Sequence, residues 1–162
     1  MTAQAETWTF EEKQKVQEKQ KEGESSEEGS EKASEADNEG ETAVEVKIHK
    51  MNAQLCMGEN LADLGGMSLA IQALELEMNQ NGWASTPEKR KSHLEVFFRS
   101  WANVWKCKQS DAYTVRALAT DPHAPTSFRG NLVNNIDAFY EAFEVSPQDK
   151  MYIAPEKRVK MW

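Results

Sequence analysis

Two acidic side chains, Glu59 and Asp63, stand four residues apart within the stretch Gly58–Gly66. On a helix this spacing places both carboxylates on one face, one turn apart. Carboxylate oxygens held in this way can bind a metal ion, or can accept a proton from another metal ligand. An acidic residue at a helix start also simply complements the helix dipole, and Asp63 could equally face solvent. Spacing alone therefore leaves both roles open for each residue.

A second group of polar residues lies in the loop Asp121–Pro125, where two prolines flank His123. Proline fixes its own φ angle and disfavours helix in the residue before it, so this backbone is expected to be extended. An imidazole in such a loop is presented to its surroundings instead of being buried in a helix. It either contributes to a site or is merely exposed. Arg129, a few residues later, could likewise be a surface or salt-bridging residue.

Apolar periodicity predicts the elements that carry the two acidic residues. Between residues 44 and 48 valine and isoleucine alternate with polar residues, which predicts a short strand. After Gly58 the apolar spacing changes to three and four, which predicts a long helix that ends at Asn81-Gly82. Glu59 and Asp63 would then lie on the first turns of this helix.

Three further helices are predicted downstream. Thr86 followed by Pro87 indicates the start of a helix with an aromatic core face. Ser110 begins a shorter helix, a loop spans residues 120–130, and a last helix runs over residues 132–143. The core face of the aromatic helix consists of Leu94, Phe97, Phe98, Trp101, Val104 and Trp105.

The N-terminal part has a different composition. Between Glu11 and Glu45 there are 13 acidic and 5 basic residues, a balance of -8 that equals the net charge of the whole 162-residue chain. Residues 22–45 have almost no large apolar side chain, so they are predicted to be disordered. The polar stretch Trp8–Lys21 before them is predicted to be helical, as part of a unit over residues 1–21. The acidic run is interpreted as a solvated insertion, with loose binding of basic proteins or metal ions as the alternative.

Composition also excludes several classes of protein. No apolar stretch reaches about 18 residues and no signal peptide begins at Met1, so a chain without a membrane segment, soluble as written, is expected. Cys56 and Cys107 form no disulfide framework, which favours a reducing, cytoplasmic location. The lysines are scattered and the net charge is negative, which argues against a nucleic-acid partner.

The stretch Gly58–Gly66 resembles the segment that supplies the third, glutamate, zinc ligand in the neprilysin and endothelin-converting-enzyme family of zinc metallopeptidases, which reads Glu-Asn-x-x-Asp followed by Leu-Gly-Gly. The resemblance covers roughly residues 46–162, including the aromatic helix, an Asp-x-His-x-Pro loop and the ending Pro155-Glu156-Lys157. Residues 8–19 show a weaker similarity to the same family. It implies a mainly α fold. Residues 46–162 would be the helical C-terminal portion of a truncated zincin catalytic lobe, with a short strand and the disordered segment before it.

The resemblance also implies roles for individual residues. Glu59 would be a zinc ligand, and Asp63 would accept a proton from a ligating imidazole and fix its orientation. His123 would donate to the oxyanion of the tetrahedral intermediate. Arg129 would hold the substrate backbone and help to order Asp63. Gly65-Gly66 would allow close packing against a helix that this sequence does not contain.

The implied function is zinc-dependent hydrolysis of peptide bonds, although the sequence contains no His-Glu-x-x-His. The chain is therefore expected to be a C-terminal fragment that supplies one zinc ligand and is inactive alone. It would act on peptides only together with its partner, the missing N-terminal part of the peptidase. Relatives are often membrane-anchored or secreted, but their animal members have cysteines where this chain has Val145 and Val159. The alternative is a non-catalytic helical interaction module from a truncated or degenerate peptidase.

Overall fold

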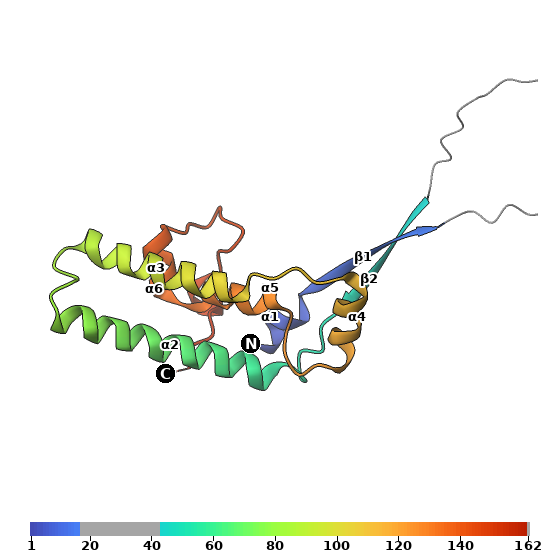
Figure 1. Cartoon of the computed structure of the whole chain (residues 1–162), viewed down its shortest axis with the longest axis horizontal. Coiled ribbons are helices and arrows are strands. Elements are labelled where there is room, and N and C mark those ends of the chain that lie inside the picture. Colours follow the sequence, from blue (N-terminus) through green and yellow to red (C-terminus); the bar gives the residue numbers. More distant parts are fainter. Residues whose placement is uncertain (17–42, 162) are drawn as a thin grey trace, which may run out of the picture.

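The computed structural model describes residues 1–16 and 43–161, so most of the acidic segment predicted to be disordered lies outside the described residues. The described part is mainly helical, as expected, with one two-stranded sheet (Figure 1). No helix in these ranges is both long and apolar enough to cross a bilayer. The elements are α1 (Thr2–Glu6), β1 (Thr9–Val16), β2 (Ala43–Lys50), α2 (Met57–Gln80), α3 (Pro87–Trp105), α4 (Asp111–Thr120), α5 (Thr126–Gly130), α6 (Asp137–Phe143) and the 3-10 helices η1 (Asn131–Asn135) and η2 (Pro155–Lys157).

The helix predicted over Trp8–Lys21 is wrong for the residues that the structure describes. A short helix, α1, ends at Glu6, and β1 then pairs antiparallel with β2 in a hairpin that projects from one end of the helical body (Figure 1). An isolated polar helix of this length is marginal, whereas the threonine and phenylalanine that open β1 suit a strand with a partner. The predicted strand at residues 44–48 is confirmed and forms part of β2.

α2 and α3 run antiparallel and are joined at the end of the molecule opposite the hairpin (Figure 1). The prediction of the α3 start is confirmed, because the Thr86 hydroxyl accepts a hydrogen bond from the Lys89 backbone N–H and Pro87 occupies the first turn. Gly82 follows the end of α2 with a φ of 67°, a conformation that favours glycine. These local signals fix the turn between the two longest helices.

The C-terminal third of the chain consists of more and shorter helices than predicted. The expected loop over residues 120–130 contains the short helix α5, and the expected helix over residues 132–143 is divided into η1 and α6 by Ile136, whose backbone is extended. The buried Asn135 side chain explains the break, because its Oδ1 accepts hydrogen bonds from Gln4 Nε2 at 2.7 Å and from the Val159 backbone N–H at 2.9 Å. A polar side chain that satisfies other backbone groups competes with helix continuation.

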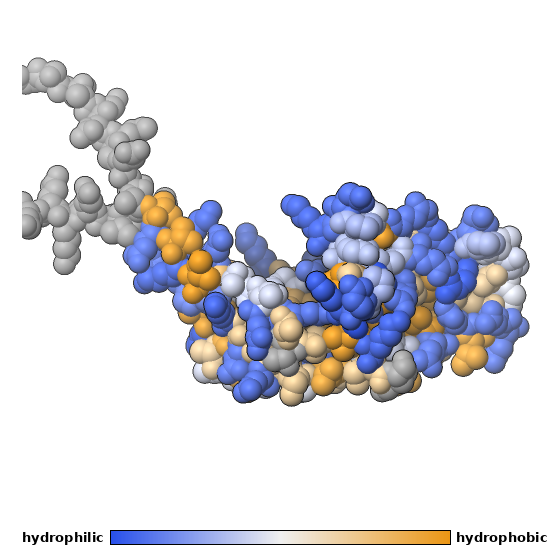
Figure 2. Space-filling view, turned by 180° about the vertical axis from the view of Figure 1, so that it is seen from behind, coloured by the Kyte–Doolittle hydropathy of each residue, from blue (hydrophilic) through white to orange (hydrophobic). Residues whose placement is uncertain are grey.

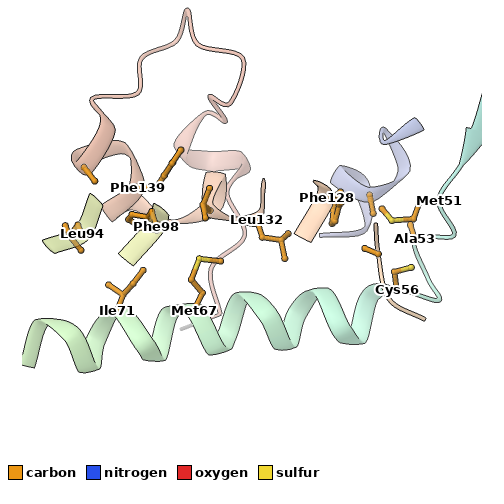
Figure 3. Packing of buried hydrophobic residues seen from close by; sticks show 14 of the residues in the cluster. Met51, Ala53, Cys56, Met67, Ile71, Leu94, Phe98, Phe128, Leu132 and Phe139 are labelled. Carbon is orange, nitrogen blue, oxygen red and sulfur yellow. The ribbon is translucent and has the colours of Figure 1, made fainter. Parts of the chain in front are cut away.

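The hydrophobic core lies between α2 on one side and α3, α6 and η1 on the other. Figure 3 shows Met67 and Ile71 of α2 pointing toward Phe98 of α3 and Leu132 of η1. Phe98 and Phe139 meet edge to face, with ring centroids 5.4 Å apart. Val104, predicted to share this core, is instead 73% exposed, because it lies on the solvent side of the last turn of α3.

Candidate active site

The first turns of α2 bring Glu59 and Asp63 to one end of the helix, as the sequence predicts. Cys56 occupies the position before the helix without a side-chain cap, so the Glu59 carboxylate is the acidic group that complements the exposed N–H groups there. The two acidic side chains differ in exposure: that of Glu59 is 46% exposed and that of Asp63 is 13% exposed. One carboxylate is thus open to a ligand, whereas the other is enclosed by protein.

Asp63 is enclosed by Arg129. The guanidinium donates from Nε to Asp63 Oδ2 at 2.5 Å and from a terminal nitrogen to Oδ1 at 2.8 Å, which is a two-point contact between residues 66 positions apart. Such paired, charge-assisted hydrogen bonds fix orientation as well as distance. Arg129 still has N–H groups that Asp63 does not use, and they can reach a further acceptor.

Two tryptophans of α3 contact Arg129. The guanidinium carbon lies 4.0 Å from the ring centroid of Trp105, a cation–π contact. The indole N–H of Trp101 donates to the Arg129 carbonyl oxygen at 3.3 Å. Gly130 lies directly against Trp105, since a Cβ placed on it would be 3.4 Å from Trp105 Cβ. The aromatic face of α3 therefore positions the arginine as well as forming core.

His123 lies next to Glu59 on the exposed side of this cluster. Its Nε2 is 3.6 Å from Glu59 Oε2, and its Nδ1 is 2.8 Å from Asp121 Oδ1. The His123 backbone N–H also donates to Asp121 Oδ1 at 2.9 Å. These two hydrogen bonds, with a smaller contribution from Arg129, hold the pKa of Asp121 below its usual value, so this carboxylate is ionised at neutral pH.

A cavity of about 270 Å³ adjoins His123 and Arg129, between α4 and the loop that precedes α5. Its wall includes Tyr113 and Thr114 of α4, Asp121 of the loop and Thr126 of α5. Beneath the loop, Cys56 Sγ lies 3.9 Å from the Asp121 carbonyl oxygen, and burial raises the pKa of this thiol. Cys56 is therefore a neutral packing residue and not a nucleophile.

Glu59 has the properties of one metal ligand, because its carboxylate is half exposed and is bound by no lysine or arginine among residues 1–16 and 43–161. The same described residues contain no group of three histidine, cysteine or acidic side chains able to enclose a metal ion. A structural or catalytic zinc site needs at least three protein ligands. The donor set thus fits zinc only as a partial site that other ligands must complete.

All four predicted site residues, Glu59, Asp63, His123 and Arg129, come together at this end of α2. Sequence reasoning missed the hydrogen bonds of Asp121 to His123, although the Asp-Pro-His order could have suggested them. It also missed the contact of Trp105 with Arg129, because the aromatic spacing of α3 indicated core alone. These additional residues orient the His123 imidazole and the Arg129 guanidinium.

The two glycines of the motif have different surroundings. Gly65 is buried, but Gly66 is exposed, and a Cβ placed on it would meet no atom within 4 Å. Within the described residues, the packing partner expected for Gly66 is therefore not present. The exposed side of α2 continues along the helix and is lined by small and aliphatic residues: Ala62, Gly66, Leu69, Ala73 and Leu76.

A convergent set of acidic, imidazole and guanidinium groups beside an open carboxylate is a candidate catalytic site. Comparison with known proteins shows the family: the family model of Peptidase family M13 matches residues 3–159. The chain therefore belongs to this family of peptidases.

Individual relatives support the same assignment. The chain is 36% identical over 120 residues to the neutral endopeptidase of Lactococcus lactis subsp. lactis (strain IL1403), which covers 74% of this chain and 17% of that protein. It is 34% identical over 115 residues to neprilysin of Homo sapiens, covering 69% of this chain and 15% of that protein.

A solved structure is also similar. The crystal structure of the zinc metalloprotease Zmp1 of Mycobacterium tuberculosis in complex with an inhibitor matches with a TM-score of 0.63 and 38% identity, over 70% of this chain and 17% of that one. The chain thus spans about 17% of the length of the Lactococcus and Mycobacterium proteins.

Proposed function

We propose that this chain is the part of a zinc metalloendopeptidase that supplies the glutamate ligand and the substrate-stabilising side chains His123 and Arg129. The observation that supports this most directly is the contrast between two neighbouring carboxylates, since Glu59 is left open while Asp63 is held by Arg129. The two imidazole ligands and the general base would come from a His-Glu-x-x-His sequence, which this chain does not contain. Bound zinc supplies a Lewis acid that lowers the pKa of water and polarises a carbonyl group.

The residues of this chain would act on the substrate as follows. The Glu59 carboxylate binds the metal, and the Asp63 carboxylate retains lone pairs that can accept from a ligating imidazole despite its contact with Arg129. His123 directs Nδ1 to Asp121, which leaves Nε2, 3.6 Å from Glu59 Oε2, as the ring nitrogen that would donate to the developing oxyanion beside the metal. The N–H groups of Arg129 that Asp63 does not use bind a substrate carbonyl oxygen.

Metal analysis tests the ligand role. The purified chain should retain little zinc, because one carboxylate leaves the other coordination positions to water. Co-expression with the remainder of the Lactococcus neutral endopeptidase should raise zinc to about one equivalent and produce peptide hydrolysis. In that complex Glu59→Ala should lose zinc, whereas Glu77→Ala, an exposed glutamate later in α2, should retain it. Retention of zinc by the Glu59→Ala complex would refute the ligand assignment.

His123→Ala separates stabilisation of the oxyanion from metal binding. In the same complex this change should leave zinc content unchanged and reduce kcat about 10² to 10³-fold. Asp121→Asn, which keeps the size of the side chain but removes its charge, should have a smaller effect in the same direction. Loss of zinc from His123→Ala would mean that His123 belongs to the metal site instead.

The second candidate, a non-catalytic interaction module, is favoured by apolar side chains left exposed on two elements. Leu69 and Leu76 of α2 are 56% and 62% exposed, and Val44 and Ile48 of β2 are 52% and 64% exposed. Figure 2 shows the apolar patch on the hairpin beside polar surroundings. The co-expression experiment decides between the two, because a stable complex without zinc or hydrolysis would favour the module.

A further inference from the structure

A second cavity lies away from Glu59, between the C-terminal half of α3 and the segment formed by α5, η1 and α6. Its volume is about 490 Å³, within the range of small-molecule pockets. Aromatic rings form much of its wall: Phe98 and Trp105 of α3, and Phe139 and Phe143 of α6. Such walls favour an apolar body.

The charged side chains that line this cavity are both cationic, and no aspartate or glutamate lines it. Arg99 and Lys106 place two positive charges at the rim. Arg99 contacts Glu95 at 3.4 Å and lies over the ring of Phe143, with its guanidinium carbon 5.3 Å from the ring centroid, whereas Lys106 forms no ion pair with any described residue.

From these observations we infer that the cavity binds a small amphipathic carboxylate, with its apolar body against the aromatic wall and its carboxylate near Lys106. Charge complementarity selects this class of ligand, because a cation would meet two positive groups and no carboxylate. A neutral apolar molecule would gain no electrostatic attraction from Lys106. This inference is independent of Glu59 and of the proposed peptidase activity.

Lys106 also has an ordinary explanation. It follows the last residue of α3, where a positive charge complements the C-terminal carbonyl groups of the helix. Lys108 lies two residues further on, is exposed and does not line the cavity. Comparison of the two lysines therefore separates ligand binding from a general effect of charge near the helix end.

Cys107 provides the readout, because it is exposed, lines the cavity and accompanies one other cysteine, the buried Cys56. The rate of Cys107 alkylation by iodoacetamide is followed by peptide mass spectrometry on the full chain. Decanoate below its micellar concentration should slow alkylation about tenfold at saturation and should bind in isothermal titration calorimetry. Decyltrimethylammonium and 1-decanol, which share the alkyl chain but lack the negative charge, should bind at least about tenfold more weakly.

Variants of the chain test where decanoate binds. Lys106→Gln should weaken decanoate binding about tenfold, whereas Lys108→Gln should change it less than about twofold. Ala102→Phe should abolish binding by filling the cavity, and because Ala102 is exposed the fold should be retained, as checked by circular dichroism. Glu59→Ala should bind decanoate like the unmodified chain. Absence of protection, equal binding of the three decyl compounds, equal effects of the two lysine changes, or binding that survives Ala102→Phe would each overturn the inference.

Discussion

The two faces of α2 are both apolar, but the described structure buries only one of them. Leu64 and Met67, on the face toward η1 and α3, are 0% and 1% exposed. Leu69 and Leu76, on the opposite face, are 56% and 62% exposed. An apolar face of a helix is normally buried against a partner. The comparison shows that this helix has two apolar faces but, within the described residues, has a partner on one of them.

Leu64→Ala should have the largest effect on stability. Removal of a fully buried leucine should lower the free energy of unfolding by about 2–5 kcal/mol, because transfer and cavity terms add. Urea unfolding of the full chain measures this loss. The matched change Leu69→Ala, in the exposed face of the same helix, should cost less than about 0.5 kcal/mol. Equal losses would show that both faces are packed in solution.

Arg129→Met should have the next largest effect and tests the border between the two faces, where Asp63 lies. Methionine keeps the length of the side chain near Trp105 but leaves the Asp63 carboxylate, 13% exposed, without its donors. The expected loss is about 1.5–3 kcal/mol in urea unfolding. Arg99→Met, which breaks a contact of a 68% exposed arginine, should cost less than about 0.5 kcal/mol. If the two changes cost the same, the contact of Arg129 with Asp63 is no stronger than a surface pair.

Acid should reduce the stability contributed by the C-terminal segment, which lies beside Ile71 on the buried face of α2. Lys160 first, and then Arg158, hold the pKa of Asp137 below its ordinary value of 3.8. A carboxyl group with a lowered pKa in the folded state adds stability that is present above its unfolded pKa and is lost as pH falls through the folded value. Asp137 is 58% exposed, so each contact should contribute only about 0.2–1 kcal/mol.

The measurement is urea unfolding between about pH 5 and about pH 2, in the unmodified chain and in Asp137→Asn. The unmodified chain should lose more stability over this range, and the difference between the two should shrink toward the acid end. Parallel curves would contradict a contribution from Asp137.

Leu76→Gln should have the smallest effect and tests the exposed face directly. Because Leu76 is 62% exposed, the free energy of unfolding should change by less than about 0.5 kcal/mol. Sedimentation velocity should show no increase in self-association, since the change removes exposed apolar surface. A large destabilisation would mean that this face has a partner within the chain or in a second copy.

Much of the fold follows from local signals. The Thr86-Pro87 and Ser110-Asp111 pairs mark two helix starts, and both hydroxyl groups accept the expected backbone hydrogen bonds, from Lys89 and Tyr113. The strand of alternating valine and isoleucine was also predictable. The errors fall where distant contacts decide: β1 depends on pairing with β2, and the break at Ile136 depends on the contacts of Asn135 with Gln4 and Val159.

The candidate site divides in the same way. The order of residues in the Glu59 motif and the Asp121 loop determined which side chains could do chemistry and which family of proteins the chain resembles, because motif spacing is a local property. The tertiary structure alone decided that Arg129 binds Asp63 and stacks on Trp105, and that Glu59 remains open beside His123. Contacts between residues so far apart in the chain depend on how the helices pack, and no local pattern of residues encodes that packing.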